Sequence, residues 1–220
     1  MSASMLSKSI AKRRRAWLVI LAFAGASCGG SGGVSVDAET EADSAGDGST
    51  AQGCPGLEPI EDSPTRIYVS PDGDDTTLGT ADAPLASLAE AANRFPTGGT
   101  VILSGGVYPP QRWFQASGSK TTPLYIRAAE GETPIFDGSQ VQEEWSAVIM
   151  MESASHVVFE GIEVRNCSAP SCQGIASEGA VLDLTIRDCH IHHMNGPAAR
   201  FAGKRIRIEG NDLHDLALTN

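Results

Sequence analysis

The sequence predicts an all-β solenoid, because a short β-rich pattern occurs three times near the C-terminal end. The segments 158–166, 185–193 and 207–215 read VFEGIEVRN, TIRDCHIHH and RIEGNDLHD, at offsets of 27 and 22 residues. Aligned, they give two apolar columns, with small or polar residues between the columns, where a chain turns. The first column holds Phe159, Ile186 and Ile208, the second holds Val164, Ile191 and Leu213, and Gly161, Asp188 and Gly210 fall between them.

The composition fits this fold class and excludes one class of partner. The chain has 24 glycines and only 5% aromatic residues, which suits turn-rich β-structure better than a helical bundle. Its 27 acidic residues outnumber its 16 basic ones, which gives a formal net charge of -11 at pH 7. Because such a chain lacks a broad basic surface to neutralise phosphates, we expect no nucleic acid partner.

Residues 1–27 are predicted to be a signal peptide. A basic stretch precedes the apolar run 16–26, which is too short to span a bilayer comfortably. Small residues then lead to Cys28, an arrangement that resembles a bacterial lipoprotein signal and implies a lipid on Cys28. The membrane would then be contacted through that lipid, at the outer membrane or cell surface. Ordinary cleavage after Ala24 or Ala26, which gives a secreted protein, is the alternative; both routes export the chain.

Residues 28–64 are predicted to be a disordered tether. The segment opens with Gly and Ser, continues with acidic residues, and contains no Lys or Arg. Gly/Ser content and like charges favour a flexible, self-repelling coil. With a lipid at its start, this tether would hold the folded domain away from a membrane surface.

The folded part begins at residues 66–75, where Ile67 and Val69 alternate with their neighbours as in a strand and a turn follows. Residues 86–94 are Ala-rich with apolar residues at helical spacing, and Ser87 is placed to cap the helix N-terminus. The pattern therefore predicts one helix near the start of an otherwise β domain. Further short strands are predicted at 100–108, 123–131, 133–139 and 146–153, before the repeats.

The stretch 68–108, which contains YVSPDGDD, LGT, APLASLAEAAN and GGTVILSGGVY, carries a specific resemblance. It resembles the N-terminal cap and first coil of right-handed parallel β-helix proteins, and most of all their pectate-lyase-like members. The resemblance implies an all-β, right-handed single-stranded parallel β-helix with an N-terminal capping helix, over residues 65–220. In such a fold the inward residues of successive coils form one core, and the helix covers an open edge. The matching residues are Tyr68, Ser70, Pro71, Gly73, Asp75, Gly79, Thr80, Pro84, Ala91, Gly99, Thr100, Val101, Gly106 and Tyr108.

The last residues follow a repeat directly, with no pattern typical of a C-terminal cap. We therefore expect the β-helix domain to be truncated at its C-terminus. The resemblance implies an exported cell-surface protein associated with polysaccharide, similar to polyuronate lyases but partial or inactive. A non-catalytic surface, adhesion or structural module is the alternative, since lyases, hydrolases, epimerases and surface proteins share this cap.

Lys204, Arg205 and Arg207 belong to the one basic cluster of the folded part. Lyases of this fold class remove a proton next to a carboxylate with a Lys or Arg base, usually beside a calcium ion held by Asp and Glu. The resemblance therefore implies these three residues as catalytic candidates and calcium as a cofactor. We expect Lys204 and Arg205 at a turn before a strand, where the alternative is a solvated corner. No Asp-rich calcium motif is visible in the middle coils, which argues against lyase activity.

Histidines give a second candidate site. In the repeat alignment His192 falls on His214, and His193 falls on Asp215. Because adjacent coils lie about 4.8 Å apart, His192, His214 and Asp215 would come within reach of one metal ion or proton relay. The alternative is a polar turn that simply faces water.

Cys167 and Cys172 bracket a tight SAPS loop and are predicted to form a disulfide, which an exported chain permits. Cys189 lies in the next repeat and could compete for a partner. Asn211 lies at a turn where a stacked amide has a structural role. Asp72, Asp74 and Asp75 are interpreted as a capped turn, because the later ligands of an EF-hand loop are missing.

Overall fold

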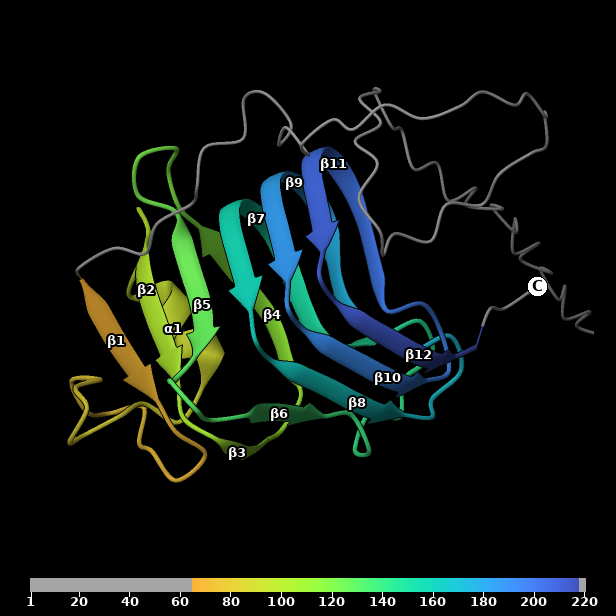
Figure 1. The fold of residues 1–220 in the computed structure, drawn as a ribbon, viewed down its shortest axis with the longest axis horizontal. Helices are drawn as coiled ribbons and strands as arrows, with labels where there is room; N and C mark the ends of the chain where they lie inside the picture. The colour runs from red at the N-terminus through yellow and green to blue at the C-terminus, as the bar shows by residue number, and fades with distance from the viewer. Residues whose placement is uncertain (1–64, 218–220) are drawn as a thin grey trace, which may run out of the picture. The chain divides into compact units, whose positions relative to one another are not determined.

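The computed structural model describes residues 65–217, which form two parallel β-sheets wound as successive coils (Figure 1). Every strand pair in both sheets is parallel, so each coil places its strands directly on those of the coil before it. The predicted fold class, an all-β parallel β-helix, is therefore confirmed. The elements of the signal peptide and tether, including Cys28, lie outside the described residues.

The large sheet has seven strands in the order β1-β2-β5-β7-β9-β11, with β4 paired to β7 at its side. It contains β1 (Arg66–Val69), β2 (Gly99–Leu103), β4 (Gln111–Ser117), β5 (Leu124–Ala128), β7 (Ala147–Glu160), β9 (Gln173–Arg187) and β11 (Ala199–Glu209).

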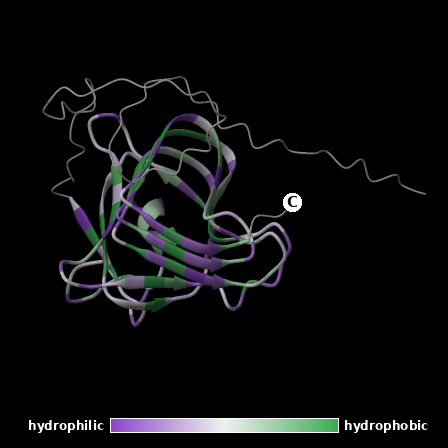
Figure 2. Cartoon of the chain, turned by 45° about the vertical axis from the view of Figure 1, so that its right-hand side comes forward, coloured by the Kyte–Doolittle hydropathy of each residue, from purple (hydrophilic) through white to green (hydrophobic). Residues whose placement is uncertain are grey.

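The small sheet has five strands in the order β12-β10-β8-β6-β3 and carries the histidines. Apolar and polar positions alternate along its strands (Figure 2), so one face packs into the core and the other is polar. Its strands are β3 (Gly106–Tyr108), β6 (Pro134–Asp137), β8 (Glu163–Cys167), β10 (His190–Met194) and β12 (Asp212–Leu216).

The strand register confirms the two apolar columns. Phe159 pairs with Ile186 and Ile186 with Ile208, while Val164 pairs with Ile191 and Ile191 with Leu213. Stacked inward side chains thus build one continuous hydrophobic core along the coils.

The residues between the columns turn the chain from the large sheet to the small sheet. Gly161, Asp188 and Gly210 have φ angles of 68°, 52° and 65°, in the left-handed region. A Cβ on Gly210 would lie 2.5 Å from the Asp188 carboxylate, which would have to move aside, while Asp188 itself adopts the left-handed turn one coil earlier without being glycine. Asn211 spans the same turn: its Oδ1 accepts from the Cys189 N–H and its Nδ2 donates to the Ile186 carbonyl, both at 2.9 Å.

The helix α1 (Leu88–Asn93) lies at the N-terminal end of the coils (Figure 1) and buries its apolar face in the core. Ser87 caps it as predicted, accepting a hydrogen bond from the Glu90 N–H. Asp75 fixes the segment before it by accepting from the N–H groups of Ala86 and Ser87, each at 2.9 Å. The Asp-rich turn therefore caps backbone donors, as the sequence indicates.

Two strands differ from the predicted elements. The strand predicted at 146–153 continues to Glu160, because a bulge between Met151 and Ala154 lets two pairing segments join into β7. The strand β4 was missed, since QRWFQAS lacks a regular alternation; β4 exists because it pairs with the first half of β7.

Candidate functional site

The polar face of the small sheet brings three histidines together on β10 and β12. Ile191 is buried and Leu213, which is 43% exposed, is its partner in the second apolar column, so their neighbours His190, His192 and His214 fall on the opposite, polar face. Parallel pairing sets His192 directly beside His214. The ring centroid of His192 lies 4.1 Å from that of His190 and 5.0 Å from that of His214, and both pairs of rings are stacked.

The imidazole nitrogens of this triad converge. The Nε2 atoms of His190 and His214 are 2.8 Å apart, and one ligand atom from each of the three residues lies within 4.8 Å of the others. Among residues 65–217 this is the only group of three or more His, Cys, Asp or Glu placed to share a metal ion. We call His190, His192 and His214 the histidine triad.

Carboxylates surround the histidine triad. The His214 Nδ1 lies 2.9 Å from an oxygen of Asp215, and the His192 Nε2 lies 3.2 Å from Glu163. The hydrogen bond from His214 lowers the pKa of Asp215, which keeps this carboxylate ionised. Burial lowers the pKa of His192, aided by the charge of His190 and opposed by the hydrogen bond to Glu163.

The sequence placed His192, His214 and Asp215 together, and all three do lie at this site. The third ligand differs from the prediction. His190 joins His192 and His214 in the cluster of ligand atoms, whereas Asp215 contacts the Nδ1 atom of His214. Strand alternation was the available signal, because residues 190 and 192 lie on one face of a strand.

A row of charged residues continues the site across the small sheet. Asp137, Arg165, His192 and His214 occupy successive partner positions on β6, β8, β10 and β12. Arg165 contacts Asp137 at 3.2 Å and Glu163 at 3.0 Å, so it fixes the carboxylate that His192 meets. Burial disfavours ionisation of Asp137, but hydrogen bonds from Ser139, Asn166 and Arg165 outweigh it and lower its pKa to about 2.

The predicted basic cluster does not form one site. Lys204 and Arg205 lie inside β11, not at a turn before a strand; the prediction is wrong because Arg205 takes a φ of 56° and bends the strand without ending it. Arg205 forms an ion pair with Asp183, while Arg207 lies 3.8 Å from Glu209. Lys204 is exposed, so the three cations have separate surroundings.

Cys167 and Cys172 are joined by a disulfide with a Cα–Cα distance of 5.9 Å, the pairing that the sequence favours. It closes the loop between β8 and β9. Cys189 is a free, buried thiol, and burial raises its pKa to about 11. Cys189 therefore does not compete for the pair.

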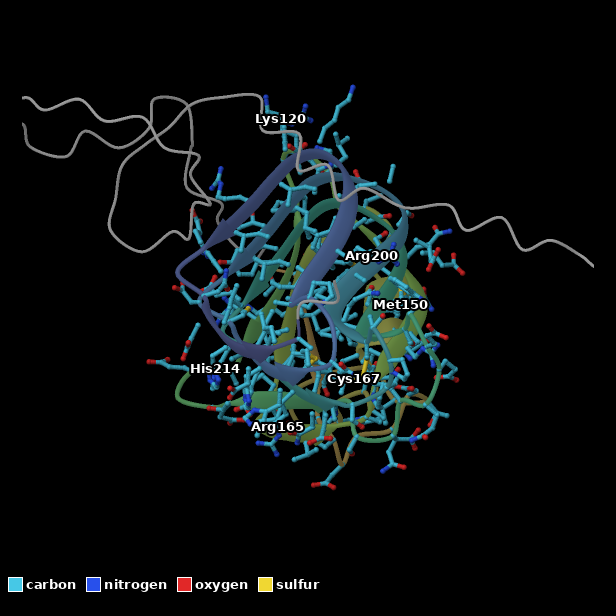
Figure 3. The ribbon with its side chains drawn as sticks, turned by 90° about the vertical axis from the view of Figure 1, so that its right-hand side faces the viewer. Lys120, Met150, Arg165, Cys167, Arg200 and His214 are labelled. Atoms are coloured by element: carbon cyan, nitrogen blue, oxygen red, sulfur yellow. A yellow bond between two sulfur atoms is a disulfide. The ribbon has the colours of Figure 1, made fainter. Side chains whose placement is uncertain are left out.

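A second row of paired residues, with an arginine at each end, crosses the first halves of the large-sheet strands and was missed from the sequence. Arg112 of β4 pairs with Met150 of β7, Met150 with Ala176 of β9, and Ala176 with Arg200 of β11. Met150 and Ala176 are buried and form, with Ala147, a small apolar cluster separate from the main core. We call Arg112, Met150, Ala176 and Arg200 the lateral row; Figure 3 shows Met150 and Arg200 on one side of the ribbon.

Polar partners engage both arginines of the lateral row. Arg200 donates to Gln173 at 2.8 Å and lies 3.5 Å from Glu178, and Arg112 donates to Glu143 at 2.9 Å. The loop that carries Glu143 also carries Trp145, which is 60% exposed. No signal in a single sequence connects these residues, because the row arises from the register of four strands.

The described carboxylates do not fit the calcium ion that the resemblance implies. Calcium takes six to eight oxygen ligands, whereas the metal-ligand cluster found in residues 65–217 is made of histidines. On the lateral row the acidic groups are engaged by guanidinium groups. We therefore assign calcium no role at this site.

The family model described as Pel9A-like, right handed beta helix region matches residues 67–216. The chain belongs to this family. Among curated relatives, the Pel9A-like chain is 46% identical over 77 residues to "Pectate lyase PEL9" of Emericella nidulans, covering 34% of this chain and 19% of the relative. It is also 29% identical over 137 residues to "Uncharacterized protein YwoF" of Bacillus subtilis, covering 60% of this chain and 29% of the relative. The Pel9A-like chain thus spans less than a third of either relative.

Solved structures agree on the fold. A rhamnogalacturonan lyase superposes with a TM-score of 0.53 at 19% identity, over 60% of this chain and 37% of that chain. The GH136 lacto-N-biosidase of Eubacterium ramulus gives a TM-score of 0.53 at 19% identity, over 69% of this chain and 34% of that chain.

Within residues 65–217 no helix is long and apolar enough to cross a bilayer.

Proposed function

We propose that this chain is a polysaccharide-binding β-helix module of an exported protein, and that the lateral row is its binding face. The observation that carries the proposal is that the register of four parallel strands places Arg112 and Arg200 at the two ends of one row. Its support comes from the family and from the names of two relatives, a pectate lyase and a rhamnogalacturonan lyase.

The dimensions of the lateral row suit an extended chain. Four strands at the usual spacing of about 4.8 Å separate the outer positions by about 14 Å, enough to lie along a few sugar units. Guanidinium groups at both ends can bind carboxylates in a bidentate manner. Met150 and Ala176 are buried between them and hold the strands of the row together, whereas the exposed Trp145, on the loop that carries Glu143, offers an aromatic surface for a sugar ring.

The same geometry favours binding over cleavage. Base-catalysed elimination needs a Lys or Arg within reach of the substrate proton and a cation on the substrate carboxylate. Arg205 is engaged with Asp183, Arg207 faces Glu209, and neither shares a site with the lateral row. We therefore propose a module without lyase activity of its own.

A non-catalytic adhesion or structural module that binds no glycan is the second candidate. It is favoured by the net charge of -11 and by the carboxylates of Glu143 and Glu178, which already face the two guanidinium groups. These carboxylates would compete with an acidic polysaccharide for the same cations.

We propose export through a lipid on Cys28, with residues 28–64 as the tether. The support is the order of a basic stretch, the apolar run 16–26 and Cys28 in the sequence. Metabolic labelling with a fatty acid should mark the wild-type chain and not Cys28→Ala. Label in neither chain, with the protein recovered from the medium, would establish ordinary secretion instead.

Affinity electrophoresis in gels containing polygalacturonate tests the binding face. The wild-type chain should be retarded, Arg200→Gln should lose most of the retardation, and Lys120→Gln should keep it. Lys120 is a matched control because it carries the same charge at a distant position (Figure 3). Equal loss in both variants would reduce the effect to net charge, and no retardation of wild type would favour the adhesion module.

Cleavage is tested separately on the same polysaccharide. The ultraviolet absorbance of unsaturated uronate products should not rise with the wild-type chain, with or without calcium. A rise that is lost in Lys204→Ala would restore the sequence-based catalytic candidate.

A further inference from the structure

We propose that the histidine triad is a binding site for a divalent transition metal ion of the zinc class, and that the ion joins the coils of β10 and β12. The site lies on the small sheet, away from the lateral row, and does not depend on polysaccharide binding. His190 and His192 come from β10, whereas His214 comes from β12.

The nitrogen positions are those of a nearly formed site. Two nitrogens on a tetrahedral zinc ion lie about 3.3 Å apart, given zinc–nitrogen distances of 2.0–2.1 Å. The Nε2 atoms of His190 and His214 are 2.8 Å apart, and the three ligand atoms fall within 4.8 Å. Small side-chain shifts would bring the nitrogens of His190 and His214 to one ion. His192, whose two ring nitrogens contact Glu163 and His193, would exchange one of these contacts for the ion, and the fourth position is left to water.

The surrounding carboxylate selects the correct nitrogen of His214. Its Nδ1 lies 2.9 Å from Asp215, so this nitrogen carries the proton and Nε2 keeps its lone pair. That lone pair is the one directed toward His190. A ligating histidine that donates its other N–H to a carboxylate is the usual second layer of zinc sites.

The local charge also favours a cation. Glu163 contacts His192, Asp212 lies 3.7 Å from His190, and Asp215 contacts His214. Only one of these carboxylates, Glu163, is balanced by an arginine, Arg165. A divalent ion would offset the remaining negative charge, and it would replace the hydrogen bond between the Nε2 atoms of His190 and His214.

The ligand types identify the class of metal. Imidazole nitrogens suit zinc, copper and nickel, whereas calcium and magnesium take oxygen ligands. Because an ion held by β10 and β12 cross-links two successive coils, it should slow the opening of β12.

Zinc titration of the untagged full chain by isothermal calorimetry tests the site. We expect one zinc ion per chain with a Kd in the micromolar range or below, and no competition by millimolar calcium. His190→Ala and His214→Ala should each weaken binding at least tenfold, and Asp215→Asn should weaken it by about tenfold. His156→Asn is the matched control, because His156 pairs with Asp183 elsewhere and its φ of 53° is one that asparagine tolerates.

Two readouts on the wild-type chain keep the proposal testable if a variant misfolds. Zinc should slow amide hydrogen exchange in residues 212–216, and it should protect the histidine triad, but not His156, from diethyl pyrocarbonate. Absence of stoichiometric zinc binding, or binding that is unchanged in both His190→Ala and His214→Ala, would overturn the proposal. The proposal would also be overturned if zinc did not change the extent to which diethyl pyrocarbonate labels the histidine triad.

Discussion

Replacing isoleucine by alanine in two successive coils of the first apolar column tests the strand register most directly. Ile186 and Ile208 are partners in the first apolar column, yet Ile186 is 1% exposed and Ile208 is 47% exposed. Ile186 is enclosed by Phe159 on one side and Ile208 on the other. We predict that Ile186→Ala destabilises the chain far more than Ile208→Ala.

The expected magnitudes follow from burial. Each substitution removes three carbon atoms, worth about 0.8 kcal/mol apiece when fully buried, or about 2.4 kcal/mol. At Ile186 a cavity between two packed coils adds to this, so the free energy of unfolding should fall by about 3–4 kcal/mol. At Ile208 nearly half of the side chain is already exposed and no closed cavity forms, so the loss should be about 1 kcal/mol.

Urea unfolding followed by circular dichroism measures both values under matched conditions. Because coils of a solenoid contact only their neighbours, Ile208→Ala should also act locally, speeding amide exchange in β11 and β12 before it affects α1. If Ile208→Ala cost as much as Ile186→Ala, the register and the exposure that support the calculation would both be refuted.

Three further predictions concern titration and turns. Burial raises the pKa of Cys189 from 9.0 to about 11, so the folded chain keeps this thiol neutral. The contribution of the neutral thiol to the free energy of unfolding is full below pH 9 and is lost as the pH rises toward 11. Cys189→Ala should therefore flatten the alkaline part of a stability–pH curve. Asp137 has its pKa lowered from 3.8 to about 2, so its contribution is present above pH 3.8 and lost as pH falls through 2; Asp137→Asn should cost about 2 kcal/mol at pH 7 and little at pH 2. Asn211→Ala should cost about 1 kcal/mol in urea unfolding, because the N–H of Cys189 and the carbonyl of Ile186 lose their side-chain partner.

Matched comparisons decide these three outcomes. Ellman's reagent should not label Cys189 in the folded chain at pH 8, and rapid labelling would contradict its burial. A pH-independent loss in Asp137→Asn would assign the effect to packing and not to charge. Unchanged stability of Asn211→Ala would mean that water replaces both hydrogen bonds.

Local patterns sufficed for the coil architecture because the inward residues repeat. Phe159, Ile186 and Ile208 lie at equivalent positions of successive repeats, and because the strands pair in parallel, equivalent residues become neighbours. The capping helix was predictable for a similar reason, since Ser87 and the apolar spacing after it act within one turn. The strand β4 was not, because its pairing with β7 outweighs a weak pattern.

The candidate sites were predictable only in part. Repeat alignment brought His192 to His214, but the convergence of His190 required the side-chain directions of both strands. The basic cluster failed as one site because Arg205 bends β11 and turns toward Asp183. The lateral row had no sequence signal, since Arg112 and Arg200 are brought into one row only by four strand registers.

The sequence by itself determined the solenoid, its cap, the turn residues and the disulfide loop, because each depends on spacing within one coil or between neighbouring coils. The tertiary structure decided which polar side chains share a surface. That outcome depends on register, bulges and left-handed residues, which shift a side chain from one face to the other. The histidine triad combines both levels: repetition places His192 beside His214, and the fold adds His190 and the carboxylates that orient the rings.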